Sequence, residues 1–240
     1  MLPALDALLP FRLTSDPTLM AAAPAPITAT ADVLVIVAHP HMEHSRANRL
    51  LMRAAARAPA ATVEVRDLYA LYPDYLIDIA AEQSRLASAR LVVWQHPIHW
   101  YSMPPLLKLW VDEVLAFGWA YGPGGNALKG KDLWLVATTG GPEDSYRPDS
   151  DNRYFFDAFL PPYEQTAALC GMRFLPPLLL HGAHRAGEVE VTAHAEVYAQ
   201  RLASYPNWPE LADLHDDVAC DVPSDARPAD TDTEFTTESA

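Results

Sequence analysis

Residues 33–48, VLVIVAHPHMEHSRAN, decide the fold class of this 240-residue chain. The first six, Val33–Ala38, form a short, continuous apolar run, which is typical of a strand that is buried on both faces. A polar loop follows this run, and the stretch Ser45–Arg57 then has the composition of a helix. A buried strand followed directly by a helix predicts the first unit of a parallel α/β sheet.

The same alternation continues as far as residue 205. We expect further strands at Thr62–Asp67, Leu91–Gln95, Asp132–Thr138 and Arg173–Leu180, and further helices at Ile77–Ala89, Pro104–Phe117, Phe156–Leu169 and Ala193–Tyr205. Five such units with buried strands predict a parallel sheet that is covered by helices on both faces. The flavodoxin-like strand order 2-1-3-4-5 is the leading choice for a doubly wound sheet of this size.

Composition divides the chain into three parts. Residues 1–31 include an Ala/Pro/Thr-rich stretch and predict a flexible leader, within which Met20 is an alternative start. Residues 32–205 form the predicted α/β domain, and residues 206–240 form an acidic tail that is too poor in large apolar side chains to pack a core. The tail carries −9 of the formal net charge of −14, so the predicted domain is only mildly acidic.

The charge and cysteine content exclude several classes of protein. An acidic chain with no basic stripe argues against binding to nucleic acid. The two cysteines, Cys170 and Cys220, lie in different predicted parts, which argues against a structural disulfide and favours a reducing cytoplasm. The N-terminus lacks the basic region of a signal peptide, and no run of 18 apolar residues predicts a membrane span.

In a doubly wound sheet, ligands bind at the carboxyl ends of the strands beside the switch point, which directs attention to the loops after Ala38, Gln95 and Thr138. In the first loop, Ser45 and Asn48 lie where a helix begins, so free backbone N–H groups and side-chain donors there suit a phosphate group. The alternative is that Ser45 only caps the helix. Neither G-x-G-x-x-G nor a phosphate-binding lysine motif is present.

Three histidines in the same loop, His39, His41 and His44, raise the question of a metal site. No cysteine and no matching set of acidic ligands accompanies them, which argues against zinc. We therefore expect no metal.

The other two loops add aromatic rings and glycines. Trp100 and Tyr101 follow the third strand, where they either stack on a flat heterocycle or close the core. Gly140 and Gly141 follow the fourth strand, where they either let the backbone approach a ligand or form an ordinary turn. Because all three loops meet at one edge of the sheet, the combination favours a site for flavin mononucleotide (FMN).

At these residues the chain resembles the NAD(P)H:quinone oxidoreductase family of flavodoxin-like flavoproteins. Within that family it is most similar to the cytoplasmic ancillary subunits of glutathione-gated potassium efflux systems, the KefF/KefG type. The resemblance rests on long stretches of distinctive sequence, among them VWQHPIHWYSMPPLLKLW at residues 93–110 and TTGGPEDSYRPDSDNRY at residues 138–154. Together they extend from about Val33 to Tyr205.

The resemblance implies a flavin site and a reaction. The implied cofactor-binding residues are His39, Ser45, Arg46, Ala47, Asn48, Pro97, Ile98, His99, Trp100, Tyr101, Thr138, Thr139, Gly140 and Gly141. The turn from Ser45 to Asn48 would hold the phosphate of FMN, and the other two loops would line its ring system. The flavin would take hydride from NAD(P)H and pass it to a quinone, with FAD as the alternative flavin.

One departure from the family pattern concerns the catalytic residues. Some quinone reductases carry a tyrosine after the two glycines and a histidine six residues later. Tyr146 matches the first, but Asn152 stands at the second, and an amide cannot carry a proton. We name Tyr146 and Asn152 as the catalytic candidates and expect quinone reduction without a pH step near ~6.5. The alternative is that Tyr146 only covers the rim of the pocket.

Two hypotheses of different kind follow from the resemblance. The first is a two-electron reductase of quinones or other electrophiles. The second is a regulatory flavin-binding subunit that activates a membrane potassium/proton antiporter and so lies at the inner face of the cell membrane through its partner. Relatives are usually homodimers, and the aromatic segment Phe117–Tyr121 is our candidate for part of that interface. A one-electron flavodoxin carrier fits less well, because such carriers lack the Trp-Tyr and Thr-Thr-Gly-Gly turns.

Overall fold

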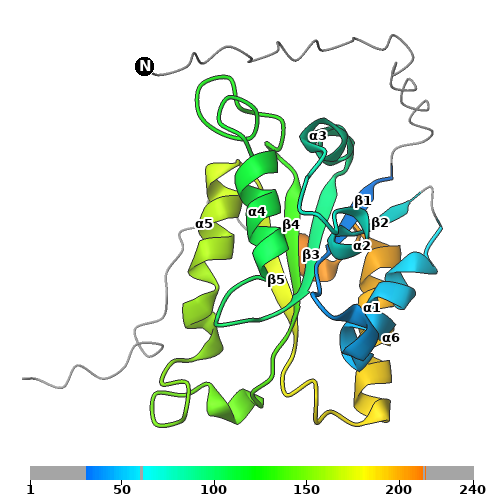
Figure 1. The fold of residues 1–240 in the computed structure, drawn as a ribbon, viewed down its shortest axis with the longest axis vertical. Coiled ribbons are helices and arrows are strands. Elements are labelled where there is room, and N and C mark those ends of the chain that lie inside the picture. The colour runs from blue at the N-terminus through cyan, green and yellow to red at the C-terminus, as the bar shows by residue number, and fades with distance from the viewer. Residues whose placement is uncertain (1–30, 60–61, 213, 215–240) are drawn as a thin grey trace, which may run out of the picture.

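A computed structural model describes residues 31–59, 62–212 and 214 of the chain. Its centre is a parallel sheet of five strands in the order β2-β1-β3-β4-β5 (Figure 1). The strands are β1 (Val33–Val37), β2 (Val63–Asp67), β3 (Leu91–Pro97), β4 (Asp132–Thr138) and β5 (Arg173–Leu180). Both the predicted fold class and the predicted strand order are confirmed.

Alternating side chains of the strands build two cores. In β1, Leu34 and Ile36 point into one core, whereas Val33, Val35 and Val37 point into the other. All five residues are at most 2% exposed, which accounts for a strand that is apolar at every position.

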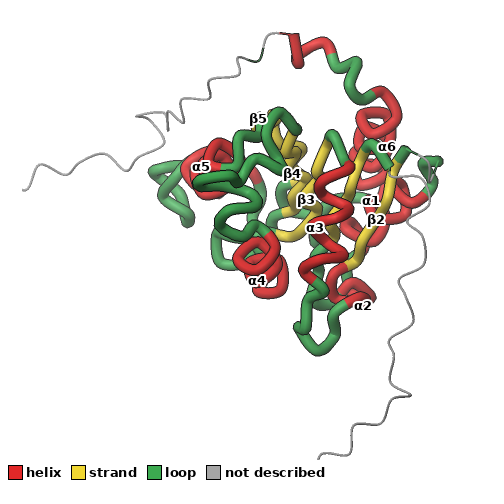
Figure 2. Tube along the Cα trace, turned by 90° about the horizontal axis from the view of Figure 1, so that it is seen from above, coloured by secondary structure: helices red, strands yellow, loops and turns green. Residues whose placement is uncertain are grey.

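Helices cover both faces of the sheet (Figure 2). One face packs against α1 (Arg46–Ala56) and α6 (Glu188–Ser204). The opposite face packs against α3 (Ile79–Ser88), α4 (Pro105–Val114), α5 (Pro161–Leu169) and the single turn α2 (Leu68–Leu71). None of the described helices is long and apolar enough to cross a membrane.

Two predicted helices differ from the observed ones. The stretch predicted as one helix, Phe156–Leu169, is a 3₁₀-helix at Phe156–Phe159 followed by α5, which begins at Pro161. Proline lacks the backbone N–H that would continue a helix from the preceding turn, so the two prolines at the start of α5 force a new beginning. The last helix begins at Glu188 rather than Ala193, directly after Gly187, which occupies its N-cap position.

The folded part of the chain also extends beyond residue 205. Trp208, which the predicted boundary assigns to the tail, is 4% exposed and packs edge-on against Trp134, with ring centroids 4.8 Å apart. Its indole nitrogen donates a hydrogen bond of 2.8 Å to the carbonyl of Arg201. Residues 1–30 of the predicted leader and residues 215–240 of the predicted tail lie outside the described residues.

The sheet register brings the three loops of interest together. Val37 at the end of β1 pairs with Gln95 in β3, and Pro97 at the end of β3 pairs with Thr138 at the end of β4. The backbone N–H of Ile98 then donates a 2.7 Å hydrogen bond to the carbonyl of Thr138. The loops after β1, β3 and β4 therefore leave the sheet side by side.

Candidate flavin site

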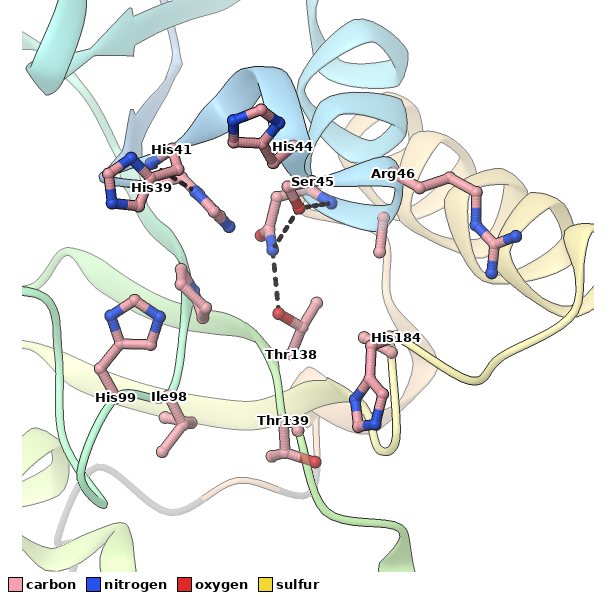
Figure 3. A pocket seen from close by; sticks show the side chains of 15 residues that line it. His39, His41, His44, Ser45, Arg46, Ile98, His99, Thr138, Thr139 and His184 are labelled. Carbon is pink, nitrogen blue, oxygen red and sulfur yellow. Dashed lines mark hydrogen bonds between the residues drawn. The ribbon is translucent and has the colours of Figure 1, made fainter.

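A cavity of about 530 Å³ lies at the carboxyl ends of β1, β3 and β4 (Figure 3). Its size falls within the range of small-molecule and cofactor sites in proteins. The lining residues are His39, His41, His44, Ser45, Arg46, Ala47, Asn48, Pro97, Ile98, His99, Thr138, Thr139, Gly140, Ala183 and His184. Eleven of the fourteen residues predicted for cofactor binding are in this set, and Trp100, Tyr101 and Gly141 are not.

One end of the cavity is the N-terminus of α1. Ser45 is the N-cap residue, and its hydroxyl oxygen accepts a 3.2 Å hydrogen bond from the backbone N–H of Asn48. The N–H groups of Arg46 and Ala47 lie in the first helical turn, where no carbonyl of the helix can accept from them. Ser45 therefore does cap the helix, and the backbone N–H groups that remain free in the capped turn are suited to bind an anion.

Asn48 connects this helix end to two strands. Its side chain is 2% exposed, and its amide nitrogen donates a 2.9 Å hydrogen bond to the hydroxyl of Thr138. The side-chain amide of Gln95 donates 3.0 Å to the backbone carbonyl of Asn48. The amide oxygen Oδ1 of Asn48 is buried without a hydrogen-bond partner among the described residues.

Arg46 does not point into the cavity. Figure 3 shows its side chain running outward from the start of α1, and its guanidinium donates a hydrogen bond to the carbonyl of Ala186. This bond ties α1 to the loop after β5.

The loop after β3 holds two aromatic residues in a tight turn. The backbone groups of His99 and Ser102 bond each other at 2.9 and 3.1 Å across Trp100 and Tyr101, which have φ angles of 48° and 64°. Two consecutive positive φ angles suit glycine and asparagine, and bulky residues adopt them only at a cost in free energy. Trp100 is 91% exposed, and Tyr101 stacks on Phe159 with centroids 5.0 Å apart, so neither ring closes the core.

The two glycines after β4, Gly140 and Gly141, have different surroundings. A Cβ atom on Gly140 would meet nothing within 4 Å, whereas a Cβ on Gly141 would lie 2.6 Å from the hydroxyl oxygen of Ser145. Gly140 lines the cavity and leaves its backbone open to a ligand, while Gly141 makes room for the following turn.

Tyr146 and Asn152 lie behind this turn rather than in the cavity wall. Tyr146 is 7% exposed, and its ring contacts Phe156 and Phe159 edge-on. Burial raises the pKa of its phenol, and the neighbouring Thr139 hydroxyl opposes this shift. The amide nitrogen of Asn152 donates 3.0 and 2.9 Å to the carbonyl and hydroxyl oxygens of Ser145, so Asn152 holds the turn together.

The histidines at the mouth of the cavity include two that are uncharged at neutral pH. Burial, together with the nearby His99 and His41, lowers the pKa of His39 from 6.5 to about 4, although Glu43 opposes the shift. Burial also lowers the pKa of His99. An anion in the cavity would therefore rely on the N-terminus of α1 rather than on these two imidazoles. Among the residues that the structure describes, no three His, Cys, Asp or Glu side chains are placed to hold a metal ion.

The sequence did not point to the loop after β5. Ala183 and His184 complete the cavity wall, and the N–H of Ala183 donates 2.9 Å to the carbonyl of Thr139. The strand order could have indicated this loop. β5 lies next to β4, so the polar sequence HGAH that follows β5 directly leaves the sheet beside the loop after β4.

Comparison with known proteins agrees with this geometry. Residues 31–204 match a family described as having a flavodoxin-like fold. The glutathione-regulated potassium-efflux system ancillary protein KefF of Citrobacter koseri is 47% identical over 173 residues, which cover 72% of this chain and 96% of the relative.

Two solved structures extend the comparison. The general stress protein 14 of Treponema denticola, solved in complex with FMN, is 38% identical with a TM-score of 0.68, covering 72% of this chain and 98% of that one. An NADPH-quinone reductase from P. pentosaceus is 26% identical with a TM-score of 0.62, covering 70% and 96%. The chain therefore belongs to the flavodoxin-like family that includes the KefF ancillary proteins and the NADPH-quinone reductases.

Proposed function

We propose that this protein is an FMN-dependent NAD(P)H:quinone oxidoreductase that transfers two electrons as hydride, first to the flavin and then to a quinone. The observation that carries the proposal is the cavity, which joins a capped helix N-terminus to the loops after β3 and β4. The FMN complex of a relative with 38% identity supports the choice of cofactor.

The phosphate of FMN fits the α1 end of the cavity. The backbone N–H groups of Arg46 and Ala47, with the Ser45 hydroxyl, supply donors, and the helix dipole favours a negative charge there. The Asn48 side chain keeps this turn in place through its bond to Thr138. We assign the phosphate to these residues, 45–48.

The ring system of the flavin fits the other part of the cavity. Pro97 and Ile98 offer an apolar wall, and Thr138, Thr139 and Gly140 offer hydroxyl and backbone groups. His39 and His99 are neutral, so each can donate or accept a hydrogen bond without bringing a charge. We assign Trp100, Tyr101 and Gly141 to the rim of this part. When bound, the flavin supplies the hydride chemistry, and the protein supplies orientation and exclusion of water.

Tyr146 is our candidate for the donor that stabilises negative charge on the quinone oxygen. Its phenol is un-ionised at neutral pH, because burial raises its pKa, and it can therefore donate a hydrogen bond. Asn152 supports this role by fixing the turn at Ser145.

Flavin binding is tested at the helix end with a pair of variants. Ser45→Asp places a carboxylate against the phosphate, whereas Ser45→Asn is neutral and of the same shape. Both residues cap helices as well as serine does. A charge pair at ~4 Å contributes about 1–4 kcal/mol at the dielectric of a protein surface, so we expect the Asp variant to bind FMN ~10- to 1,000-fold more weakly than the Asn variant.

The readout is the visible spectrum of the purified protein and the titration of the apoprotein with FMN. Chromatography of the extracted flavin distinguishes FMN from FAD. A colourless protein that takes up neither flavin would refute the proposed function. Equal FMN affinity in the two variants would refute the assignment of the phosphate to the start of α1.

Turnover is tested by following NAD(P)H oxidation at 340 nm with and without a simple benzoquinone. The expected result is quinone-dependent oxidation with ping-pong kinetics. A flavin-loaded protein without such turnover would favour the alternative, a regulatory flavin-binding subunit with little enzymatic activity.

The relationship to KefF supports a second role beside the enzymatic one. We infer that the protein binds a potassium/proton antiporter and is thereby held at the inner face of the cell membrane. The 47% identity to an ancillary protein of a potassium-efflux system is the observation in favour. Co-purification with a potassium/proton antiporter of the glutathione-regulated type tests this role, and absence of binding at micromolar concentration would contradict it.

We also propose a homodimer whose interface includes Phe117–Tyr121. Phe117 is 69% exposed and packs edge-on against Tyr121, which leaves an aromatic surface uncovered in the monomer. Light scattering should give twice the mass of one chain, and Phe117→Ser should shift the equilibrium toward the monomer. A monomeric wild-type protein with full activity would contradict the dimer.

A further inference from the structure

His181 lies directly after β5, behind the wall that Thr139 contributes to the cavity. Its Nδ1 atom is 3.1 Å from the hydroxyl oxygen of Thr139. Its ring is tilted against that of Tyr146, with centroids 5.4 Å apart, and meets Phe156 edge-on at 5.1 Å. An imidazole therefore touches both Thr139, which lines the cavity, and Tyr146, the proposed donor.

The hydrogen bonds of Thr139 bear on the tautomer of His181. The Thr139 hydroxyl has one proton, which it donates to the carbonyl of Gly141 at 2.7 Å. The same oxygen accepts a bond of 3.3 Å from the backbone N–H of Gly182. The Tyr146 phenol is a further hydrogen-bond partner of this hydroxyl. We assign the His181 contact as one in which Nδ1–H donates, which leaves Nε2 as the nitrogen that gains or loses a proton.

The surroundings of His181 keep it neutral at neutral pH. Burial lowers its pKa below the ordinary value of 6.5, and the carboxylate of Glu143 opposes this shift. The other groups against the ring are Thr139 from the end of β4, Tyr146 after the 3₁₀-helix η2 (Glu143–Ser145), and Phe156 at the start of η3 (Phe156–Phe159). Only Glu143 among these carries a charge in that pH range.

We propose that His181 is a positioning residue for acceptor reduction, which orients the Thr139 hydroxyl and, when protonated on Nε2, places a positive charge behind Thr139 and beside Tyr146. This inference rests on the proposed function. In this proposal the imidazole that is absent at position 152 is supplied instead by His181, at the end of β5.

The chemistry balances without net consumption of His181. The quinone receives a hydride that originates from NAD(P)H, and negative charge develops on one of its oxygens. That oxygen takes a proton from the hydroxyl of Tyr146, which gives the hydroquinone, and Tyr146 recovers a proton from water. At pH values low enough to protonate it, the imidazolium of His181 stabilises this negative charge and keeps its own proton.

Two variants at position 181 separate the two parts of the proposal. His181→Asn places an amide N–H where Nδ1–H donates to Thr139 but cannot become charged. His181→Phe removes both the bond and the charge. A remote histidine on α6, His194, serves as the matched control in His194→Asn.

The first measurement is the pH profile of flavin reoxidation by quinone in stopped flow, from pH 8 to pH 5. Asn152 alone would give no pH step, whereas a protonated His181 should speed up the wild type as the pH falls below 6.5, on the order of tenfold. Both position-181 variants should lose this rise, the Phe variant should be slower than the Asn variant at every pH, and the control should keep the rise. A Phe variant whose profile follows the wild type would overturn the proposal.

The second measurement needs neither flavin nor activity. Nitrogen-15 NMR of the imidazoles should show neutral His181 as the Nδ1–H tautomer with a pKa below 6.5, and Thr139→Val should abolish the tautomer preference. An Nε2–H tautomer, or a pKa at or above 6.5, would overturn the proposal even if a variant failed to fold. If flavin and turnover are absent while the tautomer is as expected, the proposed function fails and the His181–Thr139 contact stands.

Discussion

Acid should weaken the fold through one buried histidine, His96 in β3. Its side chain is fully buried, and the ring stacks on Tyr163 with centroids 5.7 Å apart. Nδ1 lies 2.9 Å from the carbonyl of Pro97, which can only accept, so Nδ1 carries the proton of the neutral ring. Nε2 is buried without a partner among the described residues, so a second proton there would find no acceptor.

The magnitude follows from the pKa difference between the folded and unfolded chains. Burial lowers the pKa of His96 from 6.5 to about 4, although the bond to Pro97 opposes the shift. Above pH 6.5 the residue is neutral in both states and the full stability is present. As the pH falls below 6.5, only the unfolded chain gains the proton. The cost to folding reaches about 2 kcal/mol at pH 5 and approaches about 3 kcal/mol at lower pH.

The assay compares urea unfolding of the wild type and His96→Phe at pH 8.5, 7.5, 6 and 5. Phenylalanine fills the same apolar site and does not titrate. The stability difference should be constant between pH 8.5 and 7.5, which serves as the internal control, and should then move by about 2 kcal/mol in favour of the variant at pH 5. A difference that stays flat down to pH 5 would show that His96 is protonated in the folded protein, or that its site is hydrated.

Four further outcomes are expected. Tyr146→Phe should slow quinone reduction by about 100-fold in stopped flow, because one donor to a developing anion contributes on the order of 3 kcal/mol, and an unchanged reoxidation rate would leave it a rim residue. Asn152→His should add a further pH step to the rate of quinone reduction only if the turn at Ser145 survives. Glu82→Ala should cost about 3–5 kcal/mol in urea unfolding, because it removes the buried carboxylate that accepts from Arg66, Tyr72 and Trp110 and leaves Arg66, among the described residues, only its ion pair with Glu64. A loss under 1 kcal/mol would contradict this reasoning. Gly141→Ala should lower the melting temperature, since its Cβ would lie 2.6 Å from the Ser145 hydroxyl, whereas Gly140→Ala should not.

The sheet could be predicted from the sequence because four strands are short, mainly apolar runs between polar loops, and β2 alternates between apolar and polar residues at its start. The expected bounds of β4 and β5 coincide with the observed ones. The two prolines inside β5, Pro176 and Pro177, are compatible with a strand because β5 lies at the edge of the sheet. Helix boundaries were less predictable, since the start of α6 depends on Gly187 and not on the apolar pattern.

The site residues that follow directly from the position of a strand end could be predicted. Those that are brought together by contacts between loops could not. Ser45 and Asn48 follow from the position of a helix start after a buried strand. The partnership of His181 with Thr139 does not, because it joins residues 42 positions apart through the geometry of two strand ends. The exposure of the Trp100 ring could not be predicted either, since it depends on a turn with positive φ angles.

Because the bond from Asn48 to Thr138 joins the two halves of the cavity, we expect ligand binding in the two halves to be cooperative. One amide group is shared between the turn that faces the proposed phosphate and the strand end that faces the proposed ring system. A ligand that orders the first half reduces the entropy that a ligand for the second half must still lose. Riboflavin and inorganic phosphate, added together, should therefore bind more tightly than either alone, and Asn48→Ala should uncouple them.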